Sequence, residues 1–160
     1  AELNQWYING IFQYPAKLRV IEISGKTLKA VVDHQIEEWS GVGWWLQSSG
    51  IAFRHDVAAQ RVTDLSLVDA DGQLTAVQDD DKIVAVVNNY ISNPAARGDQ
   101  DGYDMLNLDN ELVYGGKLID LKAFIIEQID KAHQAGQAIN PKLPGRVCNS
   151  TRPDSFCVLD

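Results

Sequence analysis

The chain has 160 residues, of which 45% are hydrophobic and 22% are charged, an ordinary composition for one globular domain with a sizeable core. The formal net charge of −8 and the pI of about 4.7 argue against a nucleic-acid backbone or an anionic membrane as a partner, because long-range repulsion would oppose encounter. A small ligand or another protein fits this charge better. No run approaches the roughly 18 apolar residues that span a bilayer, and no retained signal peptide is visible, so we expect a cytosolic chain or one whose signal has been removed.

The first part of the chain predicts helices and strands in alternation. Apolar residues at roughly helical spacing predict a short helix or a packed lead-in over 3–12, and alternation predicts a strand over 17–23. Apolar positions three and four residues apart then predict an amphipathic helix over 26–39. Strands are expected over 51–55 and 61–68.

The second part predicts further strands, a long loop and the longest helix. Asp69 to Gly72 has the composition of a hairpin turn that leads into a strand over 74–77. Five apolar residues without alternation at 83–87 predict a strand buried on both faces. Residues 92–109 are rich in Gly, Asp, Asn and Pro, and long loops of this kind in compact domains are usually functional. An amphipathic helix follows and ends at Gly136.

These elements predict an α+β fold, with a mixed β-sheet packed against two main helices. We expect residues 1–160 to form a single domain, in which 137–160 is an extended tail. Cys148 and Cys157 lie close together in this tail and are the two cysteines of the chain. Two interpretations stay open: a disulfide that staples the tail in an oxidising compartment, or two unconnected thiols.

Residue patterns for catalysis or metal binding are weak. The histidines lie far from the cysteines in sequence, which argues against zinc, and His55 is expected at the surface. The acidic residues of 99–109 are spaced like a calcium loop but lack the EF-hand order, so a solvated loop is preferred. Ser48 and Ser49 lack the context of a nucleophile. We therefore predict no catalytic residue, no metal site and no cofactor in this chain.

An aromatic pair, Trp44 and Trp45, stands in the run Gly-Trp-Trp-Leu-Gln-Ser-Ser-Gly at 43–50. Adjacent residues of an extended strand point to opposite faces, so one ring can anchor a core while the other offers a surface for stacking. The alternative is that both rings belong to the core, as large aromatics usually do.

This run, extended by Ile51, resembles the Gly-x-Phe-Leu-Gln-Val-Ser-Gly-Leu segment in the C-terminal domain of the 5′-nucleotidase family. A second likeness lies downstream. Asn-Tyr-Ile at 89–91, followed by Gly-Asp-Gln-Asp-Gly-Tyr at 98–103, is similar to that domain's Asn-aromatic-Leu-Ala and Gly-Gly-Asp-Gly-aromatic segments. The resemblance runs from about Tyr7 to the end of the longest helix, and it implies the same α+β class.

In that family the two segments each supply one ring, and the two rings hold the nucleobase between them. The resemblance therefore implies that Trp45 and Tyr103 clamp a base. Gln47 takes the place of a polar residue that contacts the base in relatives, and its amide can donate and accept hydrogen bonds. Asp109 resembles the carboxylate that accepts hydrogen bonds from ribose hydroxyls.

The family hydrolyses phosphate esters with two divalent metal ions held in an N-terminal domain, and neither its metal motifs nor the Gly-Gly-Gly-x-Arg phosphate segment is present in this sequence. The resemblance thus implies a substrate-specificity domain, a fragment of a longer two-domain phosphoesterase of the periplasm or the extracellular space. Its expected partners are a nucleoside or nucleotide and an N-terminal metallophosphoesterase domain. This chain alone should not be catalytic. The alternative is a non-catalytic module that kept the fold and binds another ligand or protein.

Overall fold

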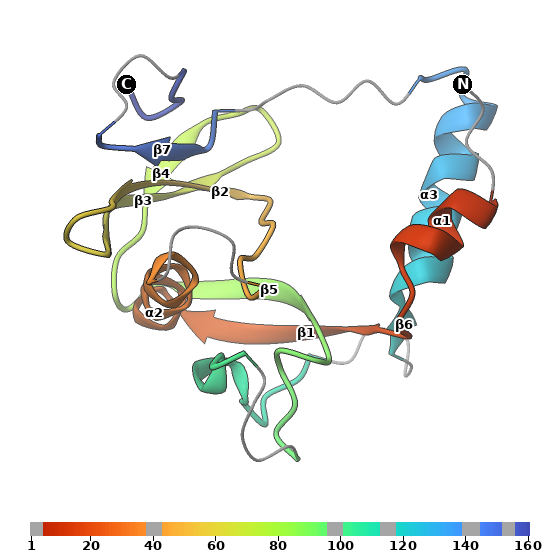
Figure 1. Ribbon diagram of the computed structural model, residues 1–160, viewed down its shortest axis with the longest axis horizontal. Helices are drawn as coiled ribbons and strands as arrows, with labels where there is room; N and C mark the ends of the chain where they lie inside the picture. Colours follow the sequence, from red (N-terminus) through yellow and green to blue (C-terminus); the bar gives the residue numbers. More distant parts are fainter. Residues whose placement is uncertain (1–4, 38–42, 96–100, 113–117, 139–144, 152–155) are drawn as a thin grey trace.

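Two β-sheets and a helix between them form the body of the protein. The computed structural model describes residues 5–37, 43–95, 101–112, 118–138, 145–151 and 156–160 (Figure 1). The first sheet has the order β5-β1-β6, with all strands antiparallel. Its members are β1 (Lys17–Ser24), β5 (Lys82–Asn88) and β6 (Ile119–Asp120).

The second sheet has the order β4-β3-β2-β7. Its members are β2 (Ile51–Asp56), β3 (Arg61–Val68), β4 (Leu74–Ala76) and β7 (Val147–Asn149). β7 runs parallel to β2, whereas the other pairs are antiparallel, so this sheet is mixed. The predicted α+β class with a mixed sheet is confirmed.

Helix α2 (Gly25–Ile36) lies between the two sheets (Figure 1). It begins where Ser24 ends β1, and the Ser24 side chain accepts a hydrogen bond from the Thr27 backbone N–H, which caps the helix. Its buried face packs against both sheets and holds the core together. The buried residues of α2 are Gly25, Leu28, Val31, Val32, Gln35 and Ile36.

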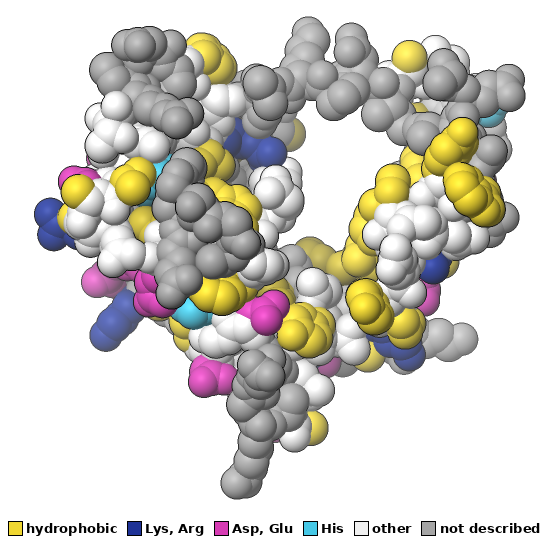
Figure 2. Space-filling view, viewed as in Figure 1, with side chains coloured by type: hydrophobic (Ala, Val, Ile, Leu, Met, Phe, Trp, Pro, Cys, Tyr) yellow, Lys and Arg dark blue, Asp and Glu magenta, His cyan; other side chains and the backbone are white. Residues whose placement is uncertain are grey.

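Helices α1 (Gln5–Ile11) and α3 (Leu121–Gln134) lie beside each other, away from the two sheets (Figure 1). Asp120 caps α3 by accepting from the Ala123 N–H at 2.8 Å, and Gly136 follows its end with φ of +69°. The predicted apolar stripe is present, but no described residue of α3 is buried. Hydrophobic side chains gather along this helix pair in Figure 2.

The prediction that strand 83–87 is buried on both faces is wrong. β5 is an edge strand, and only Ile83, Ala85 and Val87 turn toward the core. Val84 and Val86 point the other way and are 56% and 59% exposed. The prediction rested on the apolar composition of the run, which is typical of a strand covered on both faces. Among the described residues, however, no helix packs against the outer face, where Val84 and Val86 lie.

The tail contains more structure than predicted, since β7 adds a strand to the second sheet. Cys148 and Cys157 are joined by a disulfide, and both are buried. The bond fastens the last residues to the sheet edge. The predicted long loop 92–109 contains a short 3₁₀ helix, η1 (Asp104–Leu106), and its residues 96–100 lie outside the described part of the chain.

Candidate functional site

Three segments that are distant in sequence meet near the end of α2. The Tyr103 hydroxyl donates a hydrogen bond of 2.6 Å to the Trp44 carbonyl, across 59 residues of sequence. The His34 ring lies between them. It packs edge-on to the Tyr103 ring, with centroids 4.7 Å apart, and stacks with the Trp44 ring at 6.3 Å and an interplanar angle of 12°. The structure therefore brings together the two segments in which aromatic base-binding residues were predicted.

A cleft of about 800 Å³ opens beside these rings. His34 bridges two of its walls, with Nε2 2.6 Å from the Asp101 carbonyl oxygen and Nδ1 3.1 Å from the Glu37 carboxylate. One indole, one imidazole and several acceptor oxygens thus line one concave surface, a set of groups that can hold a planar polar molecule. The lining residues are His34, Glu37, Trp44, Ala59, Gln60, Asp101 and Gly102.

Gly102 allows this arrangement. Its φ of +78° lies in the left-handed region that favours glycine, and a Cβ there would approach the His34 ring to 2.6 Å. Any other residue would push the imidazole away from Tyr103. A glycine directly before Tyr103 is therefore required by packing.

Tyr103 is fully buried in this arrangement, with 0% of its surface exposed. Burial raises the pKa of its phenol, and the nearby charges of Asp101 and Glu37 act in the same direction. With the hydroxyl bonded and the ring covered, neither face of Tyr103 is open. Stacking on this ring would require its neighbours to move.

Trp45 lies in an irregular segment before β2, so the expected extended strand with rings on opposite faces is not formed there. Trp44 and Trp45 are both half-buried and pack against the core. The Trp45 ring turns toward His55, with centroids 6.3 Å apart and planes at 69°. Gln47 is exposed on the same segment.

Asp109 is exposed at the end of the predicted functional loop. A buried arginine anchors this loop to β1. Arg19 Nη1 donates to the carbonyl and the hydroxyl of Ser92 at 2.9 and 2.6 Å, and Nη2 donates to the Leu108 carbonyl at 3.1 Å. Its Nε pairs with the Glu111 carboxylate at 3.1 Å. Charge-assisted bonds of this kind hold both ends of the loop that carries Tyr103 and Asp109.

The four predicted site residues do not line the cleft beside His34, although Tyr103 directly follows Gly102 in its wall. The residues that sequence reasoning missed are His34, Glu37 and Gln60. No pattern marked them, since His34 stands on an ordinary amphipathic helix and acquires its partners only through the tertiary fold. Trp44 packs against the core and also lines the cleft.

His55 is buried, with 1% of its surface exposed, so the prediction of a surface histidine is wrong. It points inward because β2 is covered on that face, where Phe53 and Trp45 lie near its ring. Burial lowers the pKa of the imidazole, while the neighbouring Asp56 carboxylate acts in the opposite direction.

The described residues contain neither a metal-binding cluster nor a membrane-spanning helix. Within that part of the chain, no three His, Cys, Asp or Glu side chains gather as metal ligands. Across the same residues, no helix is both long and apolar enough to cross a bilayer.

No protein-family model and no curated protein matches the sequence. Solved structures do match. A 5′-nucleotidase precursor from Thermus thermophilus aligns with a TM-score of 0.77 over 94% of this chain and 28% of its own, at 19% identity. An NAD nucleotidase from Haemophilus influenzae aligns with a TM-score of 0.63 over 92% of this chain and 27% of its own, at 14% identity. The chain thus spans little more than a quarter of the proteins it resembles, and its fold is that of the C-terminal region of 5′-nucleotidases.

Proposed function

We propose that this chain is the nucleotide-recognition domain of a phosphohydrolase and that it holds a nucleobase between Trp45 and Tyr103. The observation that carries the proposal is the hydrogen bond from Tyr103 to the Trp44 carbonyl. It joins the two segments that resemble the base-binding segments of 5′-nucleotidases, within a fold shared with those enzymes over nearly the whole chain. Stacking on two rings is tolerant of base identity and contributes about 1 to 3 kcal/mol per ring, by analogy with single-stranded nucleic-acid sites.

The polar residues complete this site in the proposal. Gln47, exposed two residues beyond Trp45, donates to and accepts from the base edge. Asp109 accepts hydrogen bonds from the ribose hydroxyls, and the Arg19 anchor at Leu108 sets its position. These assignments rest on the sequence resemblance and on the exposure of both side chains.

Tyr103 needs a local rearrangement before it can stack. Its ring is covered by His34 and its hydroxyl is bonded, so ligand binding must displace these contacts. The cleft beside Gly102 is the nearest space into which a base can enter. Affinity for a nucleoside is then reduced by the free energy of uncovering the ring.

The chemistry of phosphate hydrolysis belongs to another part of the proposed parent protein. There, an N-terminal domain would hold two divalent metal ions that polarise the phosphate and activate water. The present chain contributes recognition and is not catalytic alone. A periplasmic or extracellular location is consistent with the disulfide between Cys148 and Cys157.

Titration of the chain with adenosine and with AMP tests the proposal. Binding is expected to be saturable and to change tryptophan fluorescence. Trp45→Ala should weaken it by about five- to a hundredfold, because one stacking surface is lost. Trp45→Phe should restore most of the affinity, since a smaller ring still stacks.

Tyr103→Phe provides a sharper variant in the same titration. It keeps the ring and removes the hydrogen bond that holds it in place, so nucleoside should bind about two- to tenfold more tightly. The control is Trp6→Ala, which removes an exposed tryptophan of α1 and should leave affinity unchanged. Equal weakening by Trp6→Ala and Trp45→Ala, or no saturable binding at all, would reject the nucleotide proposal.

A second candidate function is a non-catalytic protein-binding module. The observation that favours it is the exposed apolar surface of the helix pair, where Trp6 and Ile11 are 76% and 68% exposed. Under this alternative the aromatic residues near His34 only support the fold. The titration distinguishes the two, because the module would bind neither adenosine nor AMP.

A further inference from the structure

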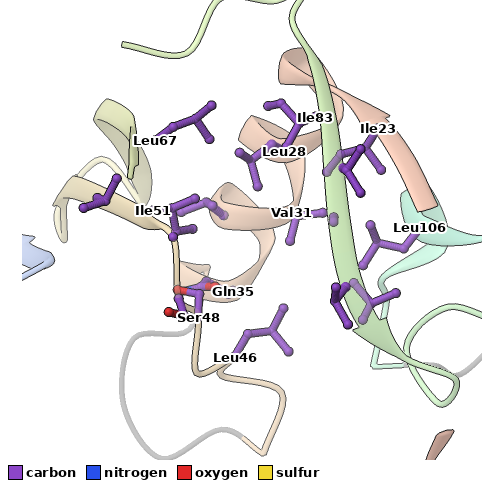
Figure 3. Close-up of a pocket in the computed structure, with 18 of the residues that line it drawn as sticks. Ile23, Leu28, Val31, Gln35, Leu46, Ser48, Ile51, Leu67, Ile83 and Leu106 are labelled. Carbon is purple, nitrogen blue, oxygen red and sulfur yellow. The ribbon is translucent and has the colours of Figure 1, made fainter. Parts of the chain in front are cut away.

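A second cavity, separate from the cleft beside His34, lies deeper in the body of the protein. It has a volume of about 950 Å³ and is enclosed by α2, β5, the start of β2 and the segment 46–50 (Figure 3). This size falls at the upper end of the range of sites that hold small organic molecules. The cavity is open to solvent on one side, so a molecule from solution can enter it.

The inner walls of the cavity are mostly apolar. α2 contributes Leu28, Val31 and Val32, and β5 contributes Ile83 and Ala85. Of the labelled side chains in Figure 3, Gln35 and Ser48 carry the polar atoms, and they lie at the same end of the cavity.

Gln35 is the unusual member of this wall. It stands seven residues after Leu28, on the apolar face of α2, and 1% of its surface is exposed. Its amide nitrogen is buried and has no hydrogen-bond partner among the described residues. Buried polar groups are nearly always paired in native proteins, and an amide without a partner on a cavity wall is therefore available to a ligand.

The cavity reaches solvent on one side. Its rim includes Gln47, Lys82 and Val84, all of which are exposed. Asp69 also lies on the rim and is exposed. No charged side chain lines the buried part among the described residues, which selects against a charged molecule inside.

Water is a poor occupant of the buried part. A buried water makes about three hydrogen bonds to polar groups, and apolar cavities stay dry. Apart from Gln35 and Ser48, the described buried walls offer hydrocarbon. An organic molecule satisfies both the walls and the amide.

We propose that this cavity binds an uncharged, largely apolar molecule that carries a carbonyl or similar oxygen, which accepts a hydrogen bond from the Gln35 amide. The apolar body of the ligand packs between α2 and β5. Of the residues assigned to the nucleoside site, Trp45, Tyr103 and Asp109 do not line this cavity, and Gln47 lies at its rim. The inference is therefore independent of the nucleotide proposal.

The test uses prodan, an uncharged naphthalene ketone whose emission shifts to the blue in apolar surroundings and to the red when its carbonyl accepts a hydrogen bond. Prodan is titrated into the full chain, with emission and thermal stability as the two readouts. We expect saturable binding at one site, with blue-shifted emission and a raised melting temperature.

Gln35→Leu tests the role of the amide. The change keeps the volume of the wall and removes the unpaired polar group, so the free protein should become more stable. Prodan should nevertheless bind about two- to tenfold more weakly, because one hydrogen bond is lost. Its bound emission should move further to the blue. A side chain with a merely structural role would not produce this spectral change.

Thr75→Trp tests the entrance. Thr75 is exposed on the edge strand β4 and lines the cavity opposite Leu67 of β3, so the fold should tolerate the larger side chain, and the indole should obstruct entry. The control is Val147→Trp, at an exposed valine on the edge strand β7 that does not line the cavity. Loss of binding in Thr75→Trp but not in Val147→Trp supports the proposal.

Two outcomes would overturn it. One is the absence of saturable prodan binding by the unmodified chain. The other is equal binding, with equal emission, by Gln35→Leu and Thr75→Trp, which would place the probe on an exposed apolar surface such as that of α1 and α3. Circular dichroism of each variant verifies that the fold is intact.

Discussion

Three buried polar side chains, those of Arg19, Gln35 and His55, differ in the partners that the fold gives them. Arg19 is fully paired and ties the functional loop to β1, whereas Gln35 has an unpaired amide nitrogen at a cavity wall. His55 is buried beside aromatic rings, and this burial lowers the pKa of its imidazole. Each of these residues costs desolvation on folding, and that cost depends on what the tertiary structure offers as a partner.

His55 predicts a pH dependence of stability. In the unfolded chain the imidazole titrates near its ordinary pKa of about 6.5, whereas the folded protein resists protonation. Below that pH the unfolded state binds more protons, so the stability that His55 contributes is present above pH 6.5 and is lost as pH falls toward the folded pKa. The slope cannot exceed about 1.4 kcal/mol per pH unit for one group.

Urea unfolding between pH 8 and pH 5 measures this effect. His55→Leu should flatten the curve below pH 6.5, because no buried imidazole remains to be protonated. His133→Leu is the control, since this histidine is exposed near the end of α3 and should leave the slope unchanged. If His55→Leu and the unmodified chain show the same slope, the buried histidine is not the cause.

For single residues, the sequence indicates which side chains are candidates for a site better than it indicates their burial and their contacts. The Gly-Asp-Gly-aromatic likeness pointed to the segment of Gly102 and Tyr103, and the structure adds that Gly102 has a φ of +78°. Burial of Tyr103 and His55, and the pairing of His34 with Asp101, depend on contacts between segments distant in sequence, which local patterns do not report. Gln35 is an exception, because a glutamine on the apolar face of a helix already stands out as a break in the hydrophobic pattern of the sequence.

At the scale of elements, the start of α2 is fitted tightly against the loop before β5. The Gly25 N–H donates to the Asp81 carbonyl and the Lys26 N–H donates to the Asp79 carbonyl, both at 3.0 Å. These bonds satisfy helix-end donors that would otherwise need other partners. A Cβ on Gly25 would overlap with the carbonyl oxygen of Gln78.

Gly25→Ala should therefore destabilise the protein by about 3 kcal/mol or more, because the helix must move away from the loop and lose these bonds. The matched control is Gly10→Ala, in α1, where a Cβ meets nothing within 4 Å. That change should be neutral or stabilise by up to about 1 kcal/mol, through the higher helix propensity of alanine. Thermal unfolding compares the two. Similar melting temperatures for both variants would mean that the loop yields to the added methyl group.

Helices and strands with a regular hydrophobic spacing were predicted close to their observed bounds. Features that depend on contacts with other strands or helices were not. β1, β3 and α2 appear close to their expected bounds because alternation or a three-to-four spacing follows from one covered face. β5 was found at the right place, but its outer face is open, which its apolar composition did not reveal. β7 was missed because three residues in a proline-rich tail carry no period, and only pairing with β2 makes them a strand.

At the scale of the whole molecule, the two helices α1 and α3 lie away from the body that the sheets form with α2 (Figure 1). Along the chain, α1 precedes β1, and α3 directly follows β6. α3 buries no described residue, and β6 is only two residues long. A helix of 14 residues whose packing is largely confined to the short helix α1 is marginal in water, since its own hydrogen bonds barely offset the entropy of ordering. α2, in contrast, is packed between the two sheets and buries six of its residues.

This difference predicts a gradient of local stability that hydrogen exchange can measure. Amides in the middle of α2 should exchange only by global unfolding, whereas those of α3 should exchange faster by on the order of a hundredfold or more, through local fraying. The measurement is made at two protein concentrations that differ by about tenfold. Fast exchange of α3 at both concentrations is the expected result and means that only α1 covers its apolar stripe in solution. Slow exchange that becomes faster on dilution would show that a second copy covers the stripe. Slow exchange independent of concentration would contradict the separation of the helix pair from the sheets, because only packing within one chain could then protect α3.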